Sequence, residues 1–296
     1  MKCNYSPLRY PGGKAKILDF TKEIIKKNFS NSKKPIYIEP YAGGAAVALG
    51  LLIDDFVSEI YINDADPAIY SFWNNVLNNT DRFIRKIINT DITVQEWQKQ
   101  SAIYKANQYH TVEQKFNLGF ATFFLNRCNH SGVLKGGVIG GLKQNGKYKI
   151  NCRFNKKDLI NRILKIASLK EKIHLFSEDS LVLLNNVNIR RLIKGNCLLY
   201  LDPPYYIKGH QLYQNSYSKR DHEKIAELMR ELEGKWIISY DNVPEIQQIY
   251  SWVEETLRLE FNLRYCVRST SKSGSEIMFF SEKITHIPDV GLISCN

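Results

Sequence analysis

The residues best suited to chemistry are four consecutive ones, Asp202, Pro203, Pro204 and Tyr205. They follow an apolar run, 197–201, that reads as a buried strand. A carboxylate and a proline-held carbonyl can both accept the hydrogens of an aryl amine, which directs the nitrogen lone pair at a sulfonium methyl group. A neighbouring tyrosine offers a ring on which an extruded base can stack. The alternative is a proline-rich turn capped by Asp202.

A glycine turn at residues 41–44 is the second candidate site. Glycines between a strand and a helix let a ligand approach the main chain closely. Asp64 lies about twenty residues further on, where an acidic side chain can hold ribose hydroxyls. The GxGxxG phosphate fingerprint is incomplete, which favours a nucleoside cofactor without phosphates, such as S-adenosylmethionine, over a dinucleotide. An isolated glycine turn remains the alternative.

A third motif, RYPGGK at residues 9–14, opens the first expected helix. Its Lys14 is either an ordinary surface lysine or a contact for a cofactor carboxylate near the helix amino terminus.

The positive charge of the chain is concentrated in one segment. The net charge is +11, and residues 126–172 hold twelve Lys and Arg against two acidic residues. Such a run often forms a solvated face, but this one also holds glycines and aromatics, which favours a surface for a polyanion such as nucleic acid. Lys143, Lys147 and Lys149 flank an Asn-Gly turn, so they can project together from a hairpin tip.

The pattern of apolar residues predicts alternating strands and helices, which is the rhythm of a doubly wound α/β sheet. Strands are expected at 35–39, 59–63, 172–176, 197–201 and 236–239, with helices at 15–29, 45–52, 67–77, 181–192, 221–232 and 243–250, and an antiparallel pair at 260–267 and 276–280.

Residues 81–172 interrupt this alternation. Helices are expected at 81–88, 94–109, 113–125 and 156–167, with a hairpin-like stretch at 131–151. The chain is therefore expected to have three parts. A first catalytic part spans 1–80, an inserted and mostly helical target-recognition domain with a basic hairpin spans 81–172, and a second catalytic part spans 173–296.

Four motifs together carry a resemblance to a known family. RYPGGK, EPYAGG, INDAD and DPPY, with a basic insertion before the last, resemble the Dam-type adenine-specific DNA methyltransferases in composition and order over residues 7–281. The resemblance implies a Rossmann-like sheet that binds S-adenosylmethionine. It also implies methyl transfer to the exocyclic amino group of adenine in double-stranded DNA after base flipping.

The resemblance also implies roles for individual residues. Asp64 would bind the ribose, Asp179 would lie near the adenine ring of the cofactor, and Asp202 would contact both the methionine end and the target amine. The other expected cofactor contacts are Tyr10, Lys14, Glu39, Pro40, Ala42, Gly43 and Gly44.

In the insertion, Phe124 to Arg127 resembles the family's LNR element, and the segment 151–155 resembles its GRY segment. Arg127 and Arg153 are therefore candidates for DNA contact, with Arg153 the better candidate for reading guanine. A phosphate-binding or structural role stays open for both. The segment 131–137, SGVLKGG, departs from members specific for GATC, which puts that target in doubt.

Two loops complete the expected site. The loop 207–220 carries Tyr217 and resembles the family loop that closes over the flipped base, and the loop 268–275 is expected near the DNA backbone. His222, at an expected helix start, reads as a capping or surface residue. The six cysteines lack zinc spacing, and neither an export signal nor a membrane span is evident.

These features predict a cytoplasmic enzyme that needs no metal and has double-stranded DNA as its partner. A cognate restriction endonuclease that acts separately is a possible further partner. Methylation of the cytosine amine and a catalytically silent DNA-binding protein are the alternatives. An NAD-dependent oxidoreductase is disfavoured because GxGxxG is absent.

Overall fold

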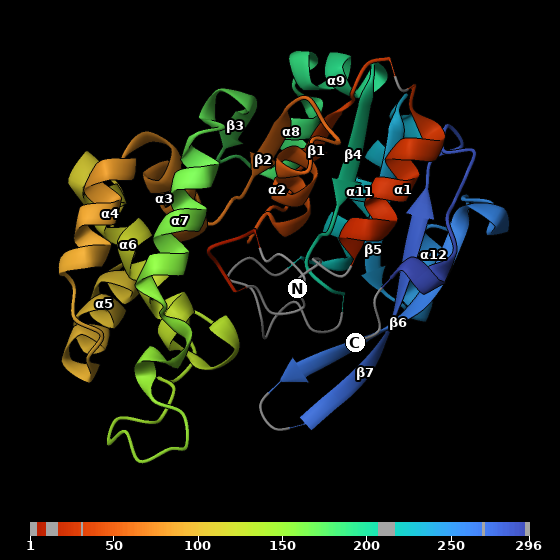
Figure 1. Cartoon of the computed structure of the whole chain (residues 1–296). Coiled ribbons are helices and arrows are strands. Elements are labelled where there is room, and N and C mark those ends of the chain that lie inside the picture. The colour runs from red at the N-terminus through yellow and green to blue at the C-terminus, as the bar shows by residue number, and fades with distance from the viewer. Residues whose placement is uncertain (1–4, 10–16, 31, 207–216, 268–269, 294–296) are drawn as a thin grey trace.

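The computed structural model describes residues 5–9, 17–30, 32–206, 217–267 and 270–293 (Figure 1). A seven-stranded sheet forms its centre, with strand order β3-β2-β1-β4-β5-β7-β6. The five strands β1 to β5 run parallel to one another, whereas β7 is antiparallel to both β5 and β6. The bounds are Ile36–Glu39 for β1, Ile60–Asn63 for β2, Ile173–Phe176 for β3, Cys197–Leu201 for β4, Lys235–Asp241 for β5, Arg258–Val267 for β6 and Thr270–Phe280 for β7.

Helices cover both faces of the sheet, because its central strands are apolar on both sides. In β4, Leu198 and Tyr200 pack into the core beneath α1, α2 and α3, while Leu199 and Leu201 pack into the core beneath α8, α9, α11 and α12. The bounds are Leu18–Asn28 for α1, Ala46–Ile53 for α2, Pro67–Asn78 for α3, Ser180–Asn185 for α8, Val187–Lys194 for α9, Lys219–Glu231 for α11 and Pro244–Ile249 for α12.

The segment between β2 and β3 builds a helical body to one side of the sheet (Figure 1). Its helix α6 packs closely on α3: a Cβ added at Gly119 would lie 2.3 Å from the carbonyl oxygen of Ser71. Asn75 of α3 also donates to the carbonyl of Phe116 at 2.8 Å. The helical body is therefore attached to the sheet through α3. Its helices are α4 (Thr80–Asn89), α5 (Val94–Ala106), α6 (Val112–Cys128) and α7 (Lys156–Ala167).

The expected doubly wound α/β fold with a helical insertion is confirmed, and the helices expected at 181–192 and 94–109 are among those that differ from the expectation. The helix expected at 181–192 is two helices, because Asn186 ends α8 and its side chain caps α9 by accepting from the amide of Asn188 at 2.9 Å. The helix expected at 94–109 ends at Ala106, because Asn107 takes a left-handed conformation.

The prediction of a hairpin at 131–151 is wrong, because this segment does not form a pair of strands. The segment is a series of turns, with one isolated bridge between Asn129 and Val138. The Gln144 side chain donates to the carbonyls of Ile139 and Gly141 and accepts from the amide of Ile150. These bonds use main-chain groups that a hairpin ladder would pair.

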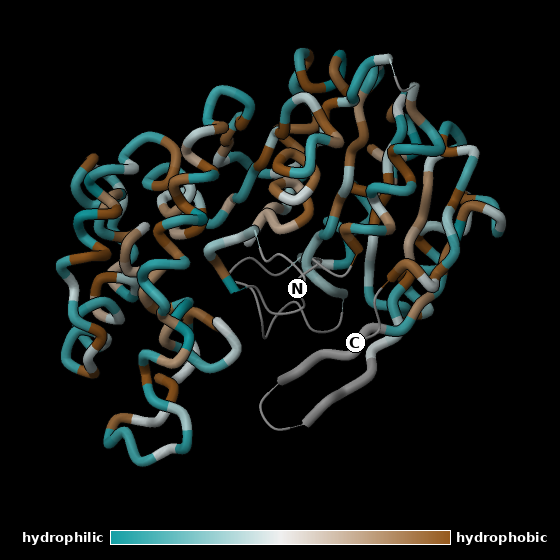
Figure 2. Tube along the Cα trace, viewed as in Figure 1, coloured by the Kyte–Doolittle hydropathy of each residue, from teal (hydrophilic) through white to brown (hydrophobic). Residues whose placement is uncertain are grey.

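Hydropathy follows this architecture. Figure 2 shows brown, hydrophobic stretches along the central strands, whereas teal and brown alternate along the outer helices. Within the part of the chain that the structure describes, no helix combines the length and the apolarity needed to cross a membrane.

Candidate active site

Acidic side chains stand at the carboxyl ends of four adjacent strands. Glu39 is the last residue of β1, Asp64 follows β2, Asp202 follows β4, and Asp179 lies three residues beyond β3. Because the strand order is β3-β2-β1-β4, these positions occur along one edge of the sheet. In open α/β sheets this edge is where ligands bind.

Glu39 is the most deeply buried of these acids, with 4% of its surface exposed. Its Oε2 atom accepts from the amide of Ala48, at the start of α2, at 3.3 Å. Burial, followed by the repulsion of Asp202, raises the pKa of Glu39 well above its usual value. The two carboxyl groups therefore interact electrostatically across neighbouring strand ends.

Asp64 holds the glycine turn through its side chain. One carboxylate oxygen accepts from the amide of Gly43 and the other from the amide of Asp66, each at 2.9 Å. The turn is further fixed by Trp73, whose indole donates to the carbonyl of Gly43 at 2.9 Å. Burial and the neighbouring Asp66 raise the pKa of Asp64 to about 7.

The rest of the glycine turn is buried and lies beside Asp64. The amide of Ala42 donates to the carbonyl of Asn63 at 2.9 Å, and the carbonyl of Pro40 accepts from the Asn63 side chain at 2.9 Å. Gly43 has a positive φ of 47°, which its lack of a Cβ allows, and Gly44 is buried next to it. The structure thus brings the predicted loop residues and Asp64 together.

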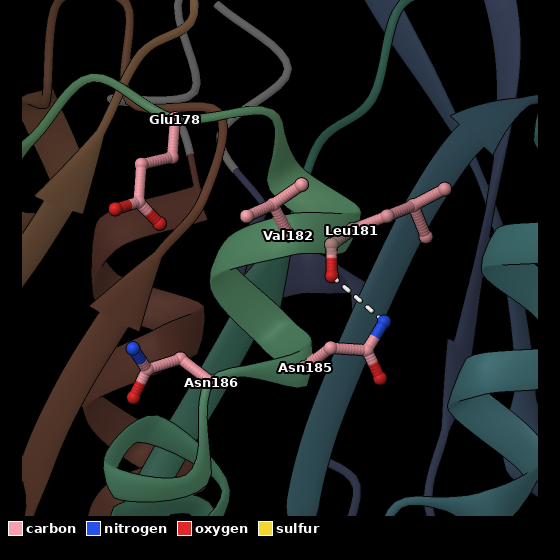
Figure 3. Close-up of a pocket in the computed structure, with 5 residues that line it drawn as sticks. All are labelled: Glu178, Leu181, Val182, Asn185 and Asn186. Atoms are coloured by element: carbon pink, nitrogen blue, oxygen red, sulfur yellow. Dashed lines mark hydrogen bonds between the residues drawn. The ribbon is translucent and has the colours of Figure 1, made fainter.

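Asp179 caps the short helix α8. Its Oδ1 accepts from the amides of Leu181 and Val182 at 2.9 and 3.4 Å, and the residue is exposed. A pocket of about 480 Å³ runs along α8 next to this cap (Figure 3). It is lined by Glu178, Leu181, Val182, Asn185 and Asn186.

The DPPY segment follows β4 directly. The Oδ1 atom of Asp202 accepts from the hydroxyl of Ser239 at 3.1 Å, and that hydroxyl lies 2.8 Å from the Tyr200 hydroxyl. Pro203 and Pro204 are buried. These bonds orient the Asp202 carboxylate from the neighbouring strand β5.

The next two residues are also held. The Tyr205 hydroxyl donates to Oε1 of Glu276 at 2.7 Å, and the amide of Tyr206 donates to Oδ1 of Asp241 at 2.9 Å. Ser239, Asp241 and Glu276 are not among the site residues predicted from the sequence. A signal was present for the first two, because they stand near the carboxyl end of the strand next to β4, where ligands bind.

An aromatic cluster lies beside the DPPY segment. The hydroxyls of Tyr41 and Tyr217 are 3.1 Å apart, and their rings meet edge to face at 6.1 Å between centroids. His222 is 0% exposed and its ring lies against those of Tyr206, Tyr217 and Tyr240. The interpretation of His222 as a surface residue is wrong: α11 begins two residues earlier than expected, at Lys219, and His222 falls on its buried face.

The LNR element anchors the amino-terminal segment. Asn126 accepts from the amide of Arg9 and donates to its carbonyl, both at 2.7 Å. Arg127 is only 8% exposed, and its guanidinium donates to the carbonyls of Arg153 at 2.7 Å and Pro7 at 3.5 Å. This geometry favours the structural role that the sequence left open for Arg127. Tyr10 and Lys14 lie outside the described residues, as does the segment 207–216.

The remaining predicted DNA contacts are exposed on the helical body. Arg153 ends a short 3-10 helix before α7, and its side chain is open to solvent. Lys143, Lys147 and Lys149 are all exposed around the Asn145 turn, and Lys149 donates to the carbonyl of Gln144 at 2.5 Å. Although the segment is not a hairpin, the three lysines still surround one tip.

The sheet topology and the row of strand-end acids define a Rossmann-like methyltransferase fold, as the sequence predicted. The family model of the D12 class N6 adenine-specific DNA methyltransferases matches residues 10–263, and the chain belongs to this family. It is therefore an adenine-specific DNA methyltransferase, and DNA is what it acts on.

Two relatives are Type II methyltransferases. M.MjaIII of Methanocaldococcus jannaschii is 24% identical over 243 residues, which is 77% of this chain and 80% of the relative. M.CviBI of Paramecium bursaria Chlorella virus NC1A is 20% identical over 274 residues, covering 91% of this chain and 95% of the relative. The solved rRNA methyltransferase aviRa from Streptomyces viridochromogenes aligns over 96% of this chain and 92% of its own with a TM-score of 0.38 and 10% identity, a similarity too weak to bear on substrate.

Proposed function

We propose that the protein transfers a methyl group from S-adenosylmethionine to the exocyclic amino group of adenine in double-stranded DNA, at a specific site and after base flipping. The observation that carries this proposal is the row of acids at the ends of β3, β2, β1 and β4, with DPPY following β4. The cofactor and the target amine would meet at Asp202.

The donor chemistry of this edge fits S-adenosylmethionine. The cofactor carries a sulfonium and an ammonium group, both of which carboxylates attract, and two ribose hydroxyls that need acceptors. Asp64 would accept from the ribose, Glu39 and Asp202 would face the methionine end, and Asp179 would lie near the adenine. Tyr10 and Lys14 stay predicted contacts, together with the turn at Pro40, Ala42, Gly43 and Gly44. When bound, the cofactor supplies an electrophilic methyl group.

The chain's own part in the reaction is to orient the nucleophile. Asp202 would accept one hydrogen of the adenine amine, and the carbonyl of Pro203 or Pro204 the other, so that the nitrogen lone pair points at the methyl group. Ser239 supports this role because its hydroxyl holds the Asp202 carboxylate in place. Tyr205 would stack on the flipped base, with Tyr217 closing the site.

The helical body would hold the DNA. We propose that residues 81–172 form the target-recognition domain between the catalytic parts 1–80 and 173–296. The exposed lysines at its tip would contact phosphates, and Arg153 would read a base. Since both relatives are Type II methyltransferases, a separately acting restriction endonuclease is proposed as a functional partner.

Label transfer tests this function directly. Purified protein is incubated with S-adenosylmethionine labelled in its methyl group and with duplexes that together sample all short sequences. Label is expected in the DNA, and sequencing that detects methylated bases then locates the site. With 2-aminopurine in place of the target adenine, fluorescence is expected to rise on binding as the base leaves the stack. Cofactor binding without label transfer would instead favour a catalytically silent DNA-binding protein.

Replacing Asp64 with alanine is expected to weaken cofactor binding by roughly 1–3 kcal/mol, because buried ribose hydroxyls lose a charged acceptor. Calorimetric titration with S-adenosylhomocysteine measures the effect. Asp55→Ala serves as a control, because Asp55 is exposed and pairs with Lys34. Equal affinity in the Asp64 variant and the wild type would place Asp64 outside the cofactor site.

The affinity should also depend on pH through the same group. Because the pKa of Asp64 is raised to about 7, part of the free protein carries this carboxyl protonated below neutral pH, and the ribose contact requires the ionised form. Affinity is therefore expected to fall by up to about tenfold for each pH unit below 7. It should level off above 7, and Asp64→Ala should lack this dependence.

Replacing Arg153 with alanine is expected to weaken DNA binding by about 1–3 kcal/mol at one base position and to relax specificity there. Affinity is measured for the target and for a scrambled duplex. Arg191→Ala, an exposed arginine on α9, is the control. An equal loss on both duplexes would make Arg153 a phosphate contact.

A further inference from the structure

Two carboxyl groups, one buried and one half-buried, hold the segment that follows Asp202. Glu276 of β7 is 1% exposed, and its Oε1 accepts from the Tyr205 hydroxyl at 2.7 Å. Asp241 of β5 stands directly opposite it in the antiparallel register and accepts from the amide of Tyr206 at 2.9 Å. Neighbouring positions of the sheet thus bind consecutive residues, one through its side chain and one through its main chain.

A buried carboxyl group in this place needs an explanation. Its neighbours in β7, Ile277 to Phe280, are all buried and apolar. An apolar residue would fill position 276 without the cost of removing a carboxyl group from water. The hydrogen bond to Tyr205 is short, within the range typical of a hydroxyl bonded to a carboxylate. Glu276 therefore restricts the rotation of the Tyr205 ring.

We propose that Glu276 is a positioning residue for methyl transfer, which acts by holding Tyr205 at the target-base side of the DPPY segment. This inference rests on the proposed function, in which Tyr205 stacks on the flipped base. Because the Tyr205 ring is already fixed in orientation, no entropy is lost in ordering it when the base arrives. More of the stacking energy is then available to align the adenine amine with the methyl group. The Asp241 side chain fixes the same segment by accepting from the backbone amide of Tyr206.

The role predicts how substitutions at position 276 behave. Glu276→Met removes the acceptor at similar volume and is expected to lower the single-turnover methylation rate about tenfold, the effect of one lost orienting bond. Glu276→Gln keeps an acceptor oxygen and should stay within about threefold of the wild type. Affinity for cofactor and DNA should change less than twofold in both variants.

The test is a double-mutant cycle. Tyr205→Phe keeps the ring and removes the donor, so it should slow the reaction as much as Glu276→Met, and the double variant should be no slower than either. Rates are measured under single turnover on a duplex that contains the target site identified by methylation sequencing. Thermal denaturation reports whether each variant is folded. Glu260→Met, an exposed glutamate on the neighbouring strand β6, is the matched control and should leave rate and stability unchanged.

The possible outcomes distinguish the proposed function from the positioning role of Glu276. A wild-type protein that methylates no duplex overturns the proposed function. An active wild type with an unchanged rate in Glu276→Met, or losses that multiply in the double variant, overturns the positioning role. If Glu276→Gln loses as much rate as Glu276→Met, the acceptor oxygen is not what matters and the proposal fails. If only stability falls while the folded fraction keeps its full rate, Glu276 is a structural residue.

Discussion

Replacing Asp202 with alanine is expected to slow methyl transfer about a thousandfold, because the variant loses the acceptor that orients the amine while the reacting groups still meet. Asp202 is half-buried at the end of β4, and Ser239 donates to it. DNA affinity is expected to change only a few-fold, since Asp202 contributes one contact of many. Single-turnover rates and binding isotherms on the same preparation measure both quantities.

A matched pair of variants separates orientation from bulk disruption. Ser239→Ala leaves the carboxylate but removes one bond that fixes it, so a loss of about tenfold is expected. Asp202→Asn keeps the shape of the side chain and one acceptor oxygen, so its loss of rate should lie between those of Ser239→Ala and Asp202→Ala. Turnover close to the wild type in Asp202→Ala would show that this carboxylate does not align the nucleophile.

The second large effect is expected from charge at the tip of the helical body. Replacing Lys143, Lys147 and Lys149 with glutamine should reduce the slope of log affinity against log salt by about 0.9 for each lysine that contacts a phosphate. The loss should be similar for target and non-target duplexes, because phosphate contacts carry no sequence information. Cofactor affinity should not change. Affinity is measured at several salt concentrations.

A control of equal charge distinguishes contact from overall electrostatics. Lys26, Lys27 and Lys33 are exposed near α1, away from the helical body (Figure 1). Their replacement with glutamine removes the same charge and should leave the slope close to that of the wild type. If the tip variant keeps the wild-type slope, or if both triple variants lower it equally, the three lysines form only a solvated face.

The sequence was most informative where local pattern and tertiary position coincide. The apolar run of β4 is buried at every residue, and its end predicted where Asp202 lies. Asp64 was expected beside the glycine turn from spacing alone, and its bond to Gly43 joins them. Both inferences rest on strand periodicity and on the rule that parallel strands end at one edge.

Residues whose environment depends on distant segments were harder to predict. Arg127 lies on a helix end that looks exposed in sequence, but the amino-terminal segment covers it and accepts its hydrogen bond at Pro7. Glu276 belongs to a strand added antiparallel to β5, and nothing local indicates that Tyr205 would reach it across the sheet. The turn at 140–146 depends on the Gln144 side chain, which turn statistics for Asn-Gly do not include.

Nucleoside analysis of the product tests most directly whether the DPPY edge methylates the amine of adenine in DNA. DNA from cells that express the protein, and from matched cells that express Asp202→Ala, is digested to nucleosides and analysed by mass spectrometry. N6-methyladenine is expected in the first sample, and none above background is expected in the second. N4-methylcytosine in place of N6-methyladenine, or equal N6-methyladenine in both samples, would contradict this expectation.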